Sequence, residues 1–129
     1  MHKVIFVLIF FFYNIFTFGQ LGPKIKFLAE DNTIDYGFVV KGRDDGFRFF
    51  EFINTGDQPL IIKNVESTCG CLIAFKPTEV ILPGKKNKIK VKYNMTVGRI
   101  SKILTVNTNA ANYENGIVKL KIKGEVIEQ

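Results

Sequence analysis

The chain contains two cysteines, Cys69 and Cys71, separated by Gly70 alone. Two sulfurs at this spacing support three kinds of chemistry. They can form a disulfide with each other, exchange with the thiols of a substrate, or bind a soft metal ion such as copper(I). The function predicted for the chain depends on which of these chemistries the pair performs.

The N-terminus bears on that choice because it has the pattern of an export signal. Lys3 is followed by an apolar run over residues 4–18 and then by small residues. This pattern predicts a cleavable signal peptide at residues 1–19 and a mature domain at residues 20–129. The alternative is an uncleaved membrane anchor. However, the run has 15 residues where a helical span needs about 20, and Asn14 interrupts it. We therefore expect an exported protein with no stable membrane span after cleavage.

An exported chain with an even number of cysteines is first a candidate for a disulfide. In an extended strand, residues two apart have Cα atoms near ~6.8 Å, the upper limit for a disulfide. We expect Gly70 to shorten this distance by adopting a backbone conformation closed to other residues. A ring this small removes little chain entropy, so the bridge should add only modest stability.

The other two chemistries remain alternatives. A strained bridge could exchange with substrate thiols, although the chain has no Cys-X-X-Cys motif. Two free thiolates could hold copper(I), but a zinc site would need carboxylates or a second chain, because the only histidine, His2, lies in the predicted signal peptide. Because the predicted mature domain has no histidine, it cannot contain a Ser-His-Asp or Cys-His arrangement. We expect no enzyme activity, no metal and no cofactor, and we interpret Asp44 and Asp45 as solvated loop charges.

The rest of the mature chain alternates polar and apolar residues with period two, and turn residues interrupt it at short intervals. This pattern predicts an all-β, immunoglobulin-like β-sandwich of seven or eight strands. The expected extended segments are residues 24–29, 33–40, 47–54, 60–66, 79–82, 87–94, 101–108 and 117–127.

Two turns separate these segments clearly. Asn54 begins one turn, in which Gly56 is expected to supply a positive φ, and Pro83-Gly84 forms another. In the segment 47–54, Phe50 and Phe52 share one face. The phenylalanines at 47 and 49 fall on the opposite face, so the strand carries a bulge or an exposed aromatic patch, and we expect them to be buried.

The net charge of +6 falls to +5 when the predicted signal peptide leaves with Lys3. Many lysines alternate with apolar residues, as in segments 88–93 and 118–123. Such lysines are typical of the solvent side of strands, where they support solubility and blunt sheet edges. We therefore expect no nucleic-acid partner.

With these features placed in order, the chain resembles the bacterial domain-of-unknown-function family 1573, over residues 34–126. The resemblance implies an immunoglobulin-like sandwich related to the domains of pilus chaperones and cilium-associated proteins, with no enzyme activity established for the family as a whole. It also implies a bacterial protein, periplasmic or secreted. Members of that family often have Thr and then Pro soon after the second cysteine. In this chain, residues 72–75 come between Cys71 and Lys76-Pro77. The matching pieces are residues 35–37, 50–56, 59–62, 65–71, 81–84, 89–93 and 124–126.

These observations together predict a non-enzymatic module that binds a protein or a cell-envelope component through a sheet edge or the loops at one end. The expected contact surface is the loop 68–75, which carries Leu72, Ile73 and Phe75. The alternative for this loop is core packing of at least two of the three side chains. The rival function is a thiol-disulfide or soft-metal-handling protein that uses Cys69 and Cys71.

Overall fold

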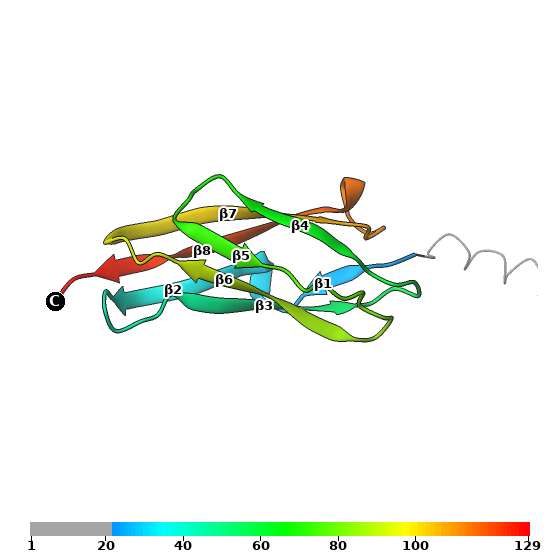
Figure 1. The fold of residues 1–129 in the computed structure, drawn as a ribbon, viewed down its shortest axis with the longest axis horizontal. Helices are drawn as coiled ribbons and strands as arrows, with labels where there is room; N and C mark the ends of the chain where they lie inside the picture. Colours follow the sequence, from blue (N-terminus) through cyan, green and yellow to red (C-terminus); the bar gives the residue numbers. More distant parts are fainter. Residues whose placement is uncertain (1–21) are drawn as a thin grey trace, which may run out of the picture.

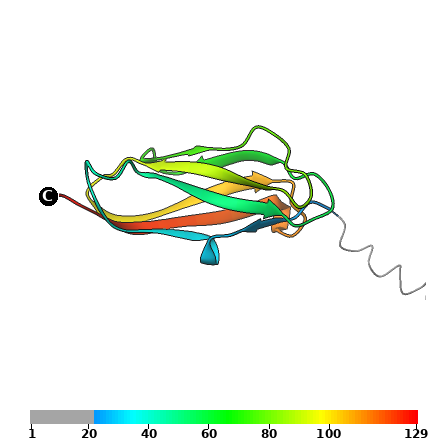
Figure 2. The same ribbon diagram turned by 90° about the horizontal axis from the view of Figure 1, so that it is seen from below.

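In the described part of the chain, eight β-strands form two four-stranded sheets that pack face to face (Figures 1 and 2). The computed structural model describes residues 22–129, so the predicted signal peptide lies outside the described residues. The expectation of an all-β, immunoglobulin-like sandwich is confirmed. The strands are β1 (Ile25–Phe27), β2 (Thr33–Val40), β3 (Phe47–Asn54), β4 (Ile62–Ser67), β5 (Leu72–Phe75), β6 (Lys86–Tyr93), β7 (Gly98–Thr108) and β8 (Ile117–Ile127).

The strands are ordered β1-β3-β6-β5 in one sheet and β2-β8-β7-β4 in the other. All neighbouring strands are antiparallel except β2 and β8, which pair in parallel from Thr33 opposite Lys121 to Val40 opposite Ile127. The predicted segment 79–82 is not a strand, because it contributes only an isolated bridge between Ile81 and Leu60. Conversely, the predicted loop 68–75 contains strand β5.

The core lies between the sheets and is built from alternate residues of their central strands. Phe50 and Ile89 from one sheet, and Leu104 and Leu120 from the other, have no exposed surface. The whole core cluster and every strand pair lie between residues 25 and 127. The core and the strand pairs thus lie inside the predicted mature domain, residues 20–129, whose bounds stay a prediction.

Phe47 and Phe49 lie on the outer face of their sheet, contrary to the expected burial. Strand β3 pairs with β6 without any register shift, so no bulge turns these side chains inward. Because Phe50 and Phe52 already occupy the inner face, the period of two places Phe47 and Phe49 outside. Phe47 is half-buried and Phe49 is 45% exposed.

The alternating lysines of β6 and β8 do face away from the core. Their predicted role at sheet edges is wrong, however, because both strands are inner strands of their sheets. The lysines therefore cover the two outer faces of the sandwich rather than its edges.

Candidate functional site

The two cysteines lie in the connection that leads from β4, in one sheet, to β5, in the other. A disulfide joins them, and their Cα atoms are 5.2 Å apart. The connection is a tight turn, since the Leu72 amide donates to the carbonyl of Cys69 at 3.3 Å. The carbonyl of Cys71 accepts from the Asn94 amide at 2.9 Å, which attaches the turn to the end of β6.

Gly70 has a different role from the one the sequence suggested. Its φ lies outside the left-handed region, and a Cβ built on it would have no heavy atom within 4 Å. The ordinary turn shortens the Cα distance between the cysteines to 5.2 Å without a conformation reserved for glycine. The expected conformational requirement at Gly70 was therefore wrong.

A hollow of about 270 Å³ lies beside the disulfide. Cys71 and Ile73 line one side of it, and Asp45 and Lys92 contribute charged groups. Within residues 22–129, no group of three or more histidine, cysteine or acidic side chains is placed to hold a metal ion. The bonded sulfurs offer no free thiolate, so the chemistry that the pair supports in this form is disulfide exchange.

The three apolar residues expected on the contact surface divide between the two faces of β5. Leu72 is only 4% exposed and packs in the core, so it is not part of any surface. Ile73 is 52% exposed and Phe75 is 50% exposed. The alternative, core packing of at least two of the three side chains, is also wrong, because in a strand only alternate residues face the core.

Strand β5 forms an edge of its sheet, with β6 as its single strand partner. Two bonds show which backbone groups face that partner: Asn94 donates to Cys71, whereas the Tyr93 amide donates to Gly46 on the far side of β6. Because antiparallel pairs alternate, Ile73 and Phe75 bond β6, and the N–H and C=O of Ala74 face outward. This edge is therefore available for hydrogen bonding.

The opposite edge of the same sheet, at β1, is covered by a side chain. Asn112 accepts a hydrogen bond from the Ile25 amide at 3.1 Å and donates to the Ile25 carbonyl at 3.0 Å. The Ala111 amide adds a bond to the Pro23 carbonyl at 2.7 Å. The side-chain amide thus takes the place of a neighbouring strand, and nothing in the sequence pattern indicated this role.

Asn54 and the turns expected around it organise the end of the sandwich near β1. The side chain of Asn54 is fully buried and donates to the carbonyls of Gln58 at 2.8 Å and Ile81 at 2.9 Å. Its oxygen accepts from the Gly56 amide at 2.9 Å. Gly56 lacks the expected positive φ; instead, a Cβ there would lie 2.1 Å from the carbonyl oxygen of Gly22.

The Pro83-Gly84 turn forms as predicted. Gly84 has a φ of 79°. The Lys85 amide donates to the Leu82 carbonyl at 3.0 Å, which makes this a type II turn. The Gly84 amide also donates to the Asn54 carbonyl at 2.8 Å, so the two motif turns support each other.

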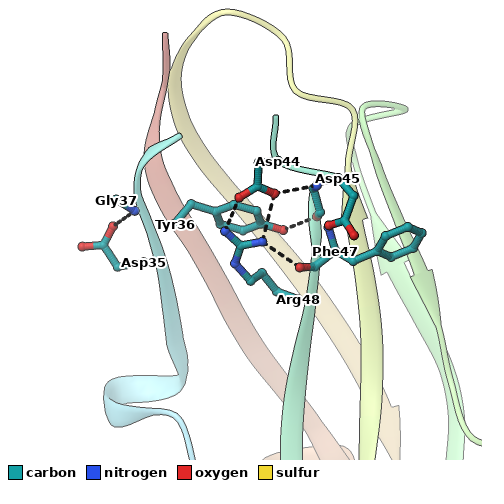
Figure 3. Close-up of polar contacts among 8 residues, drawn as sticks. Asp35, Tyr36, Gly37, Asp44, Asp45, Phe47 and Arg48 are labelled. Carbon is teal, nitrogen blue, oxygen red and sulfur yellow. Dashed lines mark hydrogen bonds and ion pairs between the residues drawn. The ribbon is translucent and has the colours of Figure 1, made fainter. Parts of the chain in front are cut away.

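A polar cluster at the other end of the sandwich was missed by sequence reasoning (Figure 3). Arg48 makes two hydrogen bonds to the Asp44 carboxylate, at 3.1 and 2.8 Å. Its guanidinium carbon lies 4.2 Å from the ring centroid of Tyr36. The Tyr36 hydroxyl donates to the Gly46 carbonyl at 2.8 Å, so a residue of β2 binds the loop that precedes β3.

The contacts within this cluster shift the pKa values of its ionisable groups. Burial raises the pKa of Tyr36 to about 12, and the nearby Arg48 charge only partly offsets it. The hydrogen bonds from Arg48 lower the pKa of Asp44, and the same pair raises the pKa of Arg48. Asp44 is thus a structural ion-pair partner rather than a solvated loop charge, and it closes this end of the sandwich.

Solved structures of low sequence identity share the fold. A protein of unknown function from Porphyromonas gingivalis superposes with a TM-score of 0.69 at 17% identity, over 82% of this chain and 48% of that one. The ASH / PapD-like domain of human CEP192 superposes with a TM-score of 0.62 at 11% identity, over 82% of this chain and 87% of that domain. The secreted serine protease VesC from Vibrio cholerae has a TM-score of 0.53 at 18% identity, over 84% of this chain and 24% of the protease.

The chain therefore spans about half the length of the P. gingivalis protein. No curated protein matches it in sequence. In residues 22–129, no helix has the length and apolar character that crossing a membrane requires. A family model described as "Protein of unknown function (DUF1573)" matches residues 27–126.

Proposed function

This chain belongs to the DUF1573 family, proteins of unknown function, and from that premise we propose that it is an exported, non-enzymatic binding module. In this proposal it takes up an extended segment of a partner protein by strand addition at β5. The partner is a free protein or a component of the cell envelope, and the module works in the periplasm or outside the cell.

The observation that carries the proposal is the difference between the two edges of one sheet. The β1 edge is covered by Asn112, which bonds both backbone groups of Ile25. At the β5 edge, the backbone groups of Ala74 have no strand partner within residues 22–129. An uncovered edge opposite a covered one is the arrangement that strand addition at a single edge requires.

An added strand would gain affinity from backbone bonds and specificity from side chains. Its residues opposite Ile73 and Phe75 would meet two half-exposed apolar side chains on the outer face. Because β5 has four residues, the backbone contributes few bonds, and side-chain contacts must select the partner. We expect bound segments to place apolar residues at alternate positions.

Export and the lack of enzyme activity are supported by the sequence. The N-terminal apolar run has the pattern of a signal peptide, and a disulfide between the two cysteines suits an oxidising compartment. The only histidine is His2, ahead of that run, so the domain has none for acid-base chemistry.

The test uses residues 20–129 as the target for a displayed library of twelve-residue peptides. Selected peptides should alternate apolar residues and should slow hydrogen exchange at the Ala74 amide. Ala74→Pro should abolish their binding at only a modest loss of stability, because this amide does not bond β6. Ala74→Ser is the matched control, since it keeps the N–H. Peptides that bind Ala74→Pro as well as the wild type would contradict strand addition.

A thiol-disulfide protein is the second candidate, favoured by the hollow beside Cys71. This function requires a bridge that exchanges readily with substrate thiols. The reduction potential of the purified domain decides the question. A value below about −300 mV, typical of structural disulfides, would contradict it.

A further inference from the structure

The two outer faces of the sandwich carry the same ladder of three lysines on an inner strand. Lys88, Lys90 and Lys92 alternate along β6. Lys119, Lys121 and Lys123 alternate along β8. In both ladders the side chains point away from the core at intervals of about 6.6 Å. The ladders differ in the side chains that surround them.

Aromatic rings surround the β6 ladder. The ammonium of Lys88 lies 4.5 Å from the ring centroid of Phe49, and that of Lys90 lies 4.2 Å from the ring of Phe47. Lys92 lies 5.1 Å from the same Phe47 ring, and Lys90 also lies 5.9 Å from the ring of Phe75 on β5. On the other face, by contrast, Lys119 donates to the hydroxyl of Thr105 at 2.9 Å.

The face around the β6 ladder is both basic and apolar. Its outward positions hold five lysines and one glutamate, which gives a net charge of 5 − 1 = +4. The lysines are Lys26, Lys86, Lys88, Lys90 and Lys92, and the acid is Glu51. The same face exposes Phe49, Ile73 and Phe75 by about half.

We propose that this face, the outer side of β1, β3, β6 and β5, docks on an anionic lipid surface. Lysines would meet the phosphates of the headgroups, while the phenylalanine and isoleucine side chains enter the interfacial region between headgroups and acyl chains. The Lys–Phe contacts place ammonium groups beside aromatic rings, so that charge and apolar surface would reach the membrane together.

Two other occupants fit the face less well. Lysine is depleted from the cores of protein–protein interfaces, which disfavours a protein partner at a lysine ladder. A polyanion in solution would bind by charge alone, and for it the β8 ladder would serve equally. Only a lipid surface uses the apolar side chains and the charge together. The lipid face and the strand-addition edge share the side chains of Ile73 and Phe75, but only strand addition needs the outward backbone groups of Ala74.

The test measures co-sedimentation of residues 20–129 with vesicles of phosphatidylglycerol and phosphatidylcholine, and with phosphatidylcholine alone. The triple variant Lys88→Gln, Lys90→Gln, Lys92→Gln should bind the anionic vesicles about 100-fold more weakly than the wild type. The matched control is Lys119→Gln, Lys121→Gln, Lys123→Gln, which removes the same charge from the same spacing and should weaken binding less than tenfold.

The apolar contribution has its own matched pair. Phe49→Thr with Phe75→Thr should weaken binding about tenfold and leave its salt dependence unchanged. Ile103→Thr with Ile117→Thr removes two exposed apolar side chains from the opposite face and should have no such effect.

Three outcomes would overturn the proposal. The first is no preference for anionic over neutral vesicles. The second is an equal loss in both lysine triples, which would mean attraction by net charge alone. The third is binding of soluble dextran sulfate through the β6 ladder that does not depend on the phenylalanines. Because Ala74→Pro should bind vesicles normally, failure here and failure of strand addition are distinguishable.

Discussion

Two glycines that both belong to recognisable sequence motifs have different structural roles. Gly56 packs so close to Gly22 that a Cβ would lie 2.1 Å from its carbonyl oxygen, whereas Gly70 has open space around it. Gly56→Ala must therefore displace backbone, and we expect it to lower the free energy of unfolding by more than about 2 kcal/mol. Gly70→Ala is the control and should change it by less than about 0.5 kcal/mol. Denaturant titration measures both, and equal losses would contradict the assigned roles.

Tyr36 makes the stability of the domain depend on pH in the alkaline range. The pKa of this phenol is 10.0 when solvated and about 12 in the fold, where it is buried. Its contribution is complete below pH 10 and is lost as the pH rises toward 12, because the unfolded chain ionises first. With about 1.4 kcal/mol per pKa unit, the loss approaches 2–3 kcal/mol.

The variant Tyr36→Phe cannot ionise, and it should lack this part of the pH dependence. Urea titration at pH 9 and at pH 11.5 measures how much the free energy of unfolding of each protein falls between the two pH values. An equal fall in the free energy of unfolding for the wild type and the variant would show that burial of the phenol does not contribute.

Single residues could be predicted from the sequence where their role is local. The Pro83-Gly84 turn depends on the φ ranges of two adjacent residues, so its type follows from their identity. Arg48 and Asp44 are also close in sequence, but the cluster includes the ring of Tyr36, which comes from the other sheet. Such a contact has no signature in the alternation of polar and apolar residues.

Strands, like single residues, could be predicted where the signal in the sequence is local. Long alternating segments such as β3 and β8 were predicted with the bounds that the structure has, because period two is visible over eight or eleven residues. Strand β5 was missed, since four consecutive apolar or small residues show no alternation. The pairing of Leu72 with Tyr93 of β6 decides which side chains of β5 face the core.

The covering of β1 by a loop side chain yields a prediction at the sheet edge. Asn112→Ala removes both bonds to the backbone of Ile25, and we expect a loss of about 1–2 kcal/mol in the free energy of unfolding. Hydrogen exchange at the Ile25 amide should become faster. Glu114→Ala, at another exposed polar position of the same loop region, serves as the control. An unchanged exchange rate at Ile25 would show that Asn112 does not protect this edge.

The assignment of strands to sheets could not be predicted from the sequence, because it depends on where the chain crosses between layers. Strand β4 belongs to one sheet and β5 to the other, although few residues separate them. The parallel pairing of β2 with β8 likewise joins residues about ninety positions apart. The disulfide lies within the crossing from β4 to β5. Its contribution to the free energy of unfolding therefore tests how much the fold depends on this tight connection.

Replacing both cysteines, Cys69→Ser with Cys71→Ser, should weaken the fold only modestly. The ring spans three residues, and its closure restricts the unfolded chain little, which corresponds to about 1–2 kcal/mol. The core contains neither sulfur among its fully buried side chains, and the Leu72 and Asn94 bonds of the turn are made by backbone atoms. Thermal unfolding of the variant should therefore remain a single transition at a lower temperature. Wild-type protein treated with dithiothreitol should behave alike. If the variant failed to fold while the reduced wild type stayed native, the serine side chains would be responsible; failure of both would show that the two sheets depend on the bridge to assemble.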